Sequence, residues 1–164
     1  MIRVRHRIEW TISDWIAETL TLLIAGSLIY SQVIYYGVLP ERIPLHFNFS
    51  GDAIGYGAKE ILWNLPITTL VLYLGLTILN RFPHIFNYPT EITEANAQRH
   101  YRNATRMIRA LKFVIVSGFT LMHWRTIQTA IGNEKGLSSW FSPIFIGATA
   151  GVLIIYLALA FRNK

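Results

Sequence analysis

The sequence predicts an all-α integral membrane protein with four transmembrane helices, a short structured extracytoplasmic loop and a cytoplasmic amphipathic helix, forming one membrane domain over residues 1–164. Composition is the first reason. Of all residues, 52% are hydrophobic and only 15% are charged, whereas soluble domains carry about 25% charged residues. Several charge-poor segments also reach the length of about 20 residues that a helix needs to cross a bilayer. Finally, the cations gather in alternate connecting segments.

Four segments meet the length requirement for transmembrane helices. They lie at about residues 17–39, 61–80, 110–131 and 141–161. The third is the weakest, because its apolar run FVIVSGFTLM is followed by HWR, and only a continuation to Ile131 supplies enough length. A re-entrant or half-buried segment is the alternative for this stretch.

The distribution of Lys and Arg predicts the orientation of the spans. If the spans alternate in direction, eleven cations fall on one side of the membrane and three on the other, with Arg125 inside the third span. The eleven are Arg3, Arg5, Arg7, Arg81, Arg99, Arg102, Arg106, Arg109, Lys112, Arg162 and Lys164. Cytoplasmic loops carry an excess of Lys and Arg. The pattern therefore places both termini and the connector 81–109 in the cytoplasm, and it explains the net charge of +6 without nucleic acid.

The connector 81–109 is predicted to contain the cytoplasmic amphipathic helix. Pro83 and Pro89 disfavour helix near its start, and Thr90 is a candidate N-cap for a helix that runs into the third span. Arginines then follow at spacings of three, four and three residues, on one stripe: Arg99, Arg102, Arg106 and Arg109. We expect the stripe to contact anionic lipid headgroups. Docking to an acidic partner subunit is the alternative, and nucleic acid is not expected, because no base-binding platform accompanies the stripe.

The loop 40–60 lies on the opposite side and is predicted to form a compact cap over the spans. Pro40 and Pro44 disfavour continuing the first span as helix. In an extended HFNFS segment side chains alternate between two faces, which puts the polar residues on one face: His46, Asn48 and Ser50.

Arg125 is predicted to take part in a polar cluster beneath this cap. A charge within a span costs about 3 kcal/mol on insertion scales, so it should find a partner. The acids on the same side are Glu41, Asp52, Glu60 and Glu134. We expect Arg125 to meet Asp52 or Glu60, and the candidate cluster comprises His46, Asn48, Asp52, Glu60, His123 and Arg125. The alternatives are that Arg125 only reaches outward to the interface, or that the cluster is a substrate or ion site.

Enzyme chemistry has little support in the sequence. The chain has no cysteine, which excludes disulfides, cysteine–zinc sites and thiol nucleophiles. There are no paired carboxylates, glycine-rich phosphate loop, HExxH motif or nucleophile elbow. His46 with one distant aspartate lacks the spacing of a metal site. We therefore expect no catalytic residue, no metal and no cofactor.

The stretch LPERIPLHFNFSGDAIGYGAK resembles a bacterial membrane family that is catalogued as a domain of unknown function and also forms the N-terminal part of SdpI-type immunity and signalling proteins. The residues that match its pattern are Leu39, Pro40, Pro44, His46, Phe47, Gly51 and Lys59. A second matching stretch runs from Phe86 to Lys112, and with the spans the resemblance covers roughly residues 20–140. It implies an integral protein of the bacterial cytoplasmic membrane with no established catalysis and no agreed binding residues. SdpI-type proteins have further spans after this region, so an immunity activity residing in those spans is not implied for this chain.

These observations together predict a non-enzymatic membrane protein, either an accessory subunit or a sensing or immunity component. Its expected partners are the lipid bilayer and other membrane subunits or copies of itself, because four spans alone make a small bundle. The alternative is a component of a transporter or channel that uses the polar outer half of the third span. A continuous polar cavity leading inward from Arg125 would favour the alternative, and densely packed helices without one would favour the first.

Overall fold

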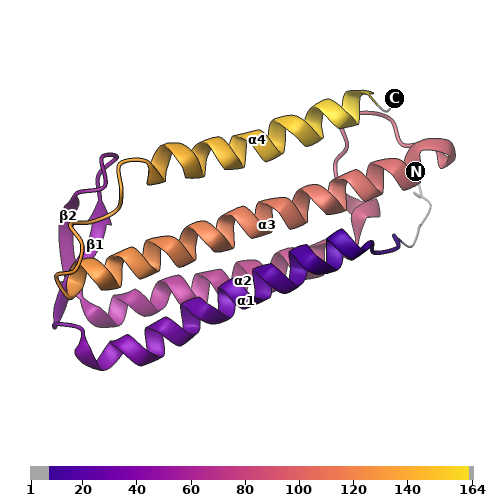
Figure 1. Ribbon diagram of the computed structural model, residues 1–164. Helices are drawn as coiled ribbons and strands as arrows, with labels where there is room; N and C mark the ends of the chain where they lie inside the picture. The colour runs from indigo at the N-terminus through magenta and orange to yellow at the C-terminus, as the bar shows by residue number, and fades with distance from the viewer. Residues whose placement is uncertain (1–7, 163–164) are drawn as a thin grey trace.

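The computed structural model describes residues 8–162 and consists mainly of four long helices (Figure 1). The helices are α1 (Ile12–Tyr35), α2 (Asn64–Leu79), α3 (Glu94–Ala130) and α4 (Phe141–Arg162). Short 3₁₀ helices are formed by Tyr36–Val38, Lys59–Trp63 and Pro83–Ile85. All four long helices, taken with the adjoining 3₁₀ turns, are long and apolar enough to cross a membrane. The prediction of four helices able to span a membrane is therefore confirmed.

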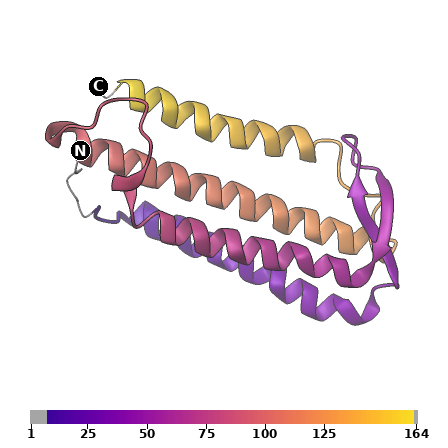
Figure 2. The same ribbon diagram turned by 180° about the vertical axis from the view of Figure 1, so that it is seen from behind.

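The bundle has two distinct ends, which Figures 1 and 2 show from opposite sides. The first and last described residues and the α2–α3 connector lie at one end, called here the termini end. The strands β1 (Arg42–Phe47) and β2 (Ala53–Ala58) lie at the other, called here the hairpin end. The charge argument also counts Arg3, Arg5, Arg7 and Lys164, which lie outside the described residues.

Helices α1, α2 and α3 form the packed part of the bundle, and α4 lies beside α3 (Figure 2). α1 and α3 run parallel, since Asp14 contacts Arg109 towards one end and Gln32 contacts His123 towards the other. α2 runs antiparallel to both, because Thr77, near its C-terminal end, bonds to Lys112. α4 is also antiparallel to α3, as the chain order requires.

Polar residues at the helix starts explain where α1 and α3 begin. The backbone N–H of Thr11 donates to Asp14 Oδ2 at 2.8 Å, and the backbone N–H of Thr93 donates to Asn96 Oδ1 at 2.9 Å. Both pairs satisfy donors that a helix start leaves free. The prediction of Thr90 as the cap of the arm helix is wrong. α3 begins three residues later because Thr93, not Thr90, has an amide acceptor three positions on.

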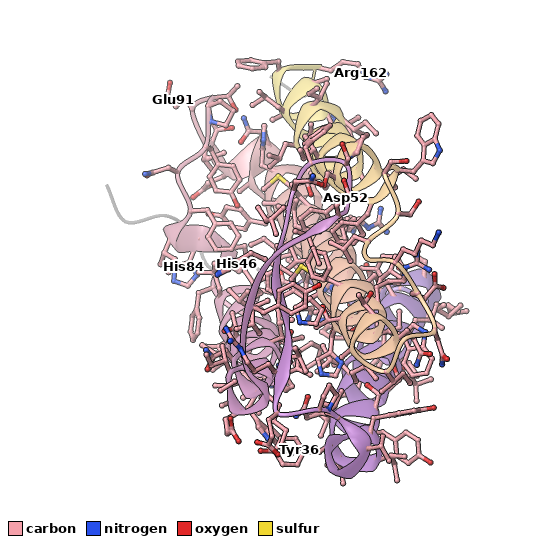
Figure 3. All side chains as sticks on the ribbon, turned by 90° about the vertical axis from the view of Figure 1, so that its left-hand side faces the viewer. Tyr36, His46, Asp52, His84, Glu91 and Arg162 are labelled. Carbon is pink, nitrogen blue, oxygen red and sulfur yellow. The ribbon has the colours of Figure 1, made fainter. Side chains whose placement is uncertain are left out.

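The loop 40–60 forms an antiparallel β-hairpin, so the all-α class needs a correction: the bundle also has a two-stranded sheet. The hairpin crosses the end of the bundle from Tyr36 to Asp52, which approaches the start of α4 (Figure 3). Its buried side seals a small apolar core made of Leu39, Ile43, Leu62 and Ile127.

The hairpin tip is locked to the α3–α4 connector by a close backbone approach. Gly51 has φ of +90°, and a Cβ there would fall 1.7 Å from the carbonyl oxygen of Leu137. Asp52 forms a β-bridge with Gly136 beside it. Only glycine combines this φ with so close a contact, which explains why glycine occupies position 51.

Candidate functional site

The buried residues of α1 form a narrow seam that faces α3. Its buried positions advance by alternate steps of four and three residues: Asp14, Glu18, Thr21, Ala25, Leu28 and Gln32. Such spacing keeps one line of side chains against a neighbouring helix over the whole length of a helix pair. What distinguishes this seam is its chemistry, because both of its ends are polar and its middle is apolar.

At the termini end, two acids of α1 meet two bases of α3, and we call these four residues the charge cluster. Arg109 Nη1 donates to Asp14 Oδ1 at 2.7 Å, and Lys112 Nζ donates to both oxygens of Glu18 at 2.8 and 2.7 Å. Arg109 Nε also lies 3.8 Å from Glu18 Oε1. The side chains of Arg109 and Lys112 are only 5% and 1% exposed, so these pairs are shielded from solvent.

Further groups complete the environment of the two buried cations. Lys112 Nζ donates a third hydrogen bond to Thr77 Oγ1 of α2 at 2.7 Å and lies 4.6 Å from the ring centre of Tyr73. The Arg109 guanidinium lies 4.6 Å from the ring of Trp10. The cluster therefore joins all three packed helices. Two negative and two positive charges balance within it, which is the condition for tolerating buried charge.

Towards the hairpin end, His123 of α3 contacts two polar residues of α1, and we call this group the histidine cluster. His123 Nε2 lies 2.7 Å from Gln32 Oε1, and Nδ1 lies 3.3 Å from Ser31 Oγ. A carbonyl oxygen only accepts, so Nε2 carries the proton in this contact. The Ser31 hydroxyl donates to the Leu28 carbonyl at 2.8 Å. Gln32 Nε2 has no hydrogen-bond partner among the described residues, which leaves one donor of the cluster unused.

Arg125 does not join a cluster beneath the hairpin. It forms an ion pair with Glu134, nine residues along the chain, in the turn that follows α3. The expectation that it meets Asp52 or Glu60 is therefore wrong. The turn explains this outcome, because Gly132 has φ of +84° and the Glu134 N–H bonds back to the Gln128 carbonyl, which returns Glu134 to the helix.

The other candidates for that cluster are dispersed. Asn48 and Asp52 bond to each other in the hairpin turn, with Asn48 Oδ1 accepting from the Asp52 N–H at 2.8 Å and Asn48 Nδ2 donating to Asp52 Oδ2 at 3.0 Å. His46 is exposed on β1 above Gly55, and Glu60 is exposed in the 3₁₀ turn before α2. His123 belongs to the α1–α3 seam instead. Within residues 8–162, no group of three or more His, Cys, Asp or Glu side chains could hold a metal ion.

The arginine stripe of α3 divides into exposed and buried members. Arg99 and Arg102 are exposed, and Arg106 is half-buried with Nε 3.7 Å from Asp14. Arg109 is buried in the charge cluster, so the prediction of a lipid or partner contact is wrong for this residue. Arg102 and Arg109 are seven residues apart, so they differ by only about 20° around the helix axis but by about 10 Å along it. Arg109 lies level with Asp14, near the start of α1, whereas Arg102 lies nearer the start of α3 and beyond that contact.

The charge cluster contains three residues that the sequence argument did not single out as a site: Asp14, Glu18 and Lys112. A signal was available. Asp14 and Glu18 stand four residues apart near the start of the first span, while Arg109 and Lys112 stand three apart near the start of the third. Both pairs fall on the same side of the membrane in the predicted topology. Complementary charges on two parallel spans at equal depth indicate an interhelical network.

Comparisons with known proteins find similarity to one family and to one distant relative. Residues 22–70 match the family described as "Domain of unknown function (DUF1648)". This segment includes the first sequence motif, residues 39–59, but not the second, residues 86–112. The chain is also similar to a protein of Archaeoglobus fulgidus described as "Uncharacterized protein", with 26% identity over 153 residues that cover 84% of each chain. No solved structure matches it. These findings support a membrane-span-bearing chain related to a family of unknown function.

Proposed function

We propose that this chain is a non-enzymatic integral membrane protein that acts as an accessory subunit, or as a sensing or immunity component, of a bacterial cytoplasmic membrane. The observation that carries the proposal is the use of its buried polar groups. The charge cluster and the histidine cluster both bond α1 to α3, so these groups hold helices together. The bacterial source is part of this proposal, and the similar protein found by comparison is archaeal.

An apolar layer between the two clusters also favours this function over transport. Along α1, Ala25 and Leu28 separate Glu18 from Ser31, and on α3 the fully buried Val116 lies between Lys112 and His123. The two polar groups of α1 lie about 20 Å apart at 1.5 Å per residue. The Thr21 hydroxyl, which lies between them, bonds to the Ala17 carbonyl of its own helix. An ion or solute would therefore meet a closed apolar contact.

Purification from the native membrane tests the accessory role. The chain would be extracted in mild detergent, and the co-purifying proteins would be quantified against it. The expected result is a membrane protein that co-purifies with the chain in a fixed ratio. A monodisperse monomer with no companion across several mild detergents would contradict an accessory subunit.

The proposed orientation places the termini end in the cytoplasm, following the excess of Lys and Arg there. Because the chain has no cysteine, single cysteines report position without background. A membrane-impermeant maleimide added to intact cells should label Ser50→Cys and should label Asn103→Cys only after permeabilisation. Equal labelling of both positions in sealed cells would contradict four alternating spans.

A component of a transporter or channel is the second candidate, and one cavity favours it. A cavity of about 580 Å³ between α3 and α4 includes Arg125 and Ser138 at one end, although most of its lining is apolar, as at Phe113 and Phe145. Reconstitution in liposomes that contain an ion- or pH-sensitive dye tests this function. Flux above that of empty liposomes, reduced by Arg125→Gln, would support it, and flux equal to that of empty liposomes would contradict it.

A further inference from the structure

A second cavity, of about 390 Å³, opens at the termini end of the bundle, and neither the fold nor the proposed function accounts for it. It lies between the segment that leads into α1, the end of α2 with the following connector, and α3. Its lining residues are Ile8, Trp10, Glu18, Thr77, Asn80, Arg81, Pro83, Thr105 and Arg109. In contrast to the cavity beside α4, this one carries two guanidinium groups, a carboxylate, an amide and two hydroxyls.

Two buried polar groups in this lining have unused hydrogen-bonding capacity. Arg109 is 4% exposed, and its Nε–H has no hydrogen-bond partner within the described part of the chain, since Glu18 Oε1 lies 3.8 Å away. The side-chain oxygen of Asn80 is also buried without a partner among residues 8–162. Buried polar groups are normally bonded, and exceptions indicate a missing partner. Both atoms have almost no accessible surface, and both belong to residues that line the same cavity.

The charges around the cavity favour an anionic group. Asp14 and Glu18 are balanced by Arg109 and Lys112, so the cluster itself is neutral. Arg81 adds a positive charge at the exposed side of the cavity and forms no ion pair with another described residue. Glu18 in the lining opposes a bare anion, however. A suitable ligand must therefore combine a negative group with hydrogen-bond donors of its own.

We propose that this cavity binds the headgroup of an anionic phospholipid, a phosphodiester that carries hydroxyl groups. Its phosphate oxygens accept from Arg81 and, once the side chains that cover it turn aside, from Arg109 Nε–H, because guanidinium groups match phosphate geometry. A headgroup hydroxyl donates to Asn80 Oδ1 after the same adjustment. The cavity lies at one end of helices that span a bilayer, where headgroups are found, and basic pockets between helices at such ends bind anionic headgroups. The proposal requires neither an accessory role nor a particular orientation.

Lipid titration of the protein purified in mild detergent tests this site. The probes are dioctanoyl phosphatidylglycerol and dioctanoyl phosphatidylcholine, with binding counted by native mass spectrometry and followed by thermal shift. Phosphatidylglycerol should bind more tightly than phosphatidylcholine, whose quaternary ammonium has no donor. Arg81→Gln should weaken phosphatidylglycerol binding about tenfold, the effect of losing a hydrogen bond to a charged group. Arg162→Gln removes the same charge from an exposed position at the same end, outside the cavity and outside the arginine stripe, and should leave affinity unchanged.

A second variant addresses the donor requirement separately. Asn80→Leu should abolish the preference for phosphatidylglycerol over phosphatidylcholine while phosphatidylcholine binding is kept. Glycerophosphoglycerol, the same hydroxyl-bearing phosphodiester without acyl chains, distinguishes a lipid from a soluble source of the same chemistry. Equal Arg81-dependent binding of this soluble ester would support the site and assign it to a free phosphate ester. Equal affinity of the Arg81→Gln and Arg162→Gln proteins, or equal affinity for the two lipids, would overturn the proposal.

Discussion

Helices α1 and α4 both pack on α3, but they do so by different means. α1 meets α3 through a continuous seam with two ion pairs at one end and a buried histidine contact at the other. α4 has no buried residue. It contacts α3 through aromatic side chains, with Phe145 packed over Gly118 and its ring centre 6.5 Å from that of Phe119.

This difference shows how helices are selected as neighbours in a bilayer. Lipid chains are as apolar as leucine, so apolar surface alone gives helices little reason to associate. The polar seam fixes the register and direction of α1 against α3, because a shift would leave charges unpaired. The α4 contact depends on shape at a small residue. We therefore expect α1 to be held specifically and α4 to be the more easily displaced helix.

Removing one charge from the charge cluster should weaken the α1–α3 contact and should cause the largest loss of stability. Lys112→Met removes the cation that donates to both oxygens of buried Glu18 and leaves it only Arg109, with Nε 3.8 Å away. Breaking a buried pair in this way costs about 3–5 kcal/mol. The free energy of unfolding, measured by denaturant titration in mixed micelles, should fall by that amount. Lys135→Met, at an exposed position, serves as the matched control and should change stability little.

A double variant separates pairing from packing at the same place. Glu18→Leu combined with Lys112→Met removes both charges, so no unpaired charge stays buried and much of the stability should return. If Lys112→Met alone cost less than about 1 kcal/mol, or if the double variant were no better than the single one, the pairing would not be what holds α1 to α3.

The histidine cluster should have the next largest effect. His123→Ala removes the contact with Gln32 and leaves a cavity in a fully buried position. We expect a loss of about 2 kcal/mol, because buried hydrogen-bonding groups are left without partners. The comparison variant is His46→Ala, at an exposed position of strand β1. Similar stabilities of these two variants in the same denaturant titration would show that the buried contact contributes nothing.

A substitution at Gly118 should affect α4 and leave α1 in place. A Cβ at this position would fall 2.3 Å from the Phe145 ring, so Gly118→Val should destabilise the α3–α4 contact by about 1–3 kcal/mol through overpacking. Disulfide cross-linking in membranes measures both contacts. One cysteine pair, Leu121→Cys with Ile144→Cys, spans the α3–α4 cavity. The other pair, Ile24→Cys with Thr120→Cys, joins α1 to α3. The first cross-link should weaken and the second should persist.

Gly26→Val is the control for this experiment, since a Cβ at Gly26 meets nothing within 4 Å. It places the same branched side chain in a helix without crowding a neighbour. Unchanged cross-linking of α4 in the Gly118→Val protein would mean that the helix is held by contacts other than the Phe145 packing.

The sequence predicted the helices better than it predicted the polar contacts, for a physical reason. Span length and apolar composition act along one segment, so the four helices could be located from local runs of residues. Partner choice depends on how two segments face each other. Arg125 pairs with Glu134 because a glycine turn brings this acid back to the helix, and Arg109 is buried because it lies level with Asp14 of α1. Neither follows from composition. The matching spacings of Asp14 with Glu18 and of Arg109 with Lys112 could have been read in advance.

The smallest effect is expected at Arg125, and it tests whether charge within a span is always critical. Its ion pair with Glu134 is local in sequence, and the two side chains are 25% and 39% exposed. Pairs of this kind contribute about 0–1 kcal/mol. Arg125→Gln, Glu134→Gln and the double variant should therefore all unfold within about 1 kcal/mol of the unmodified protein. A loss at Arg125→Gln as large as that at Lys112→Met would place this arginine in a buried network, as its position in the span first suggested, and would remove the contrast between the two charged sites.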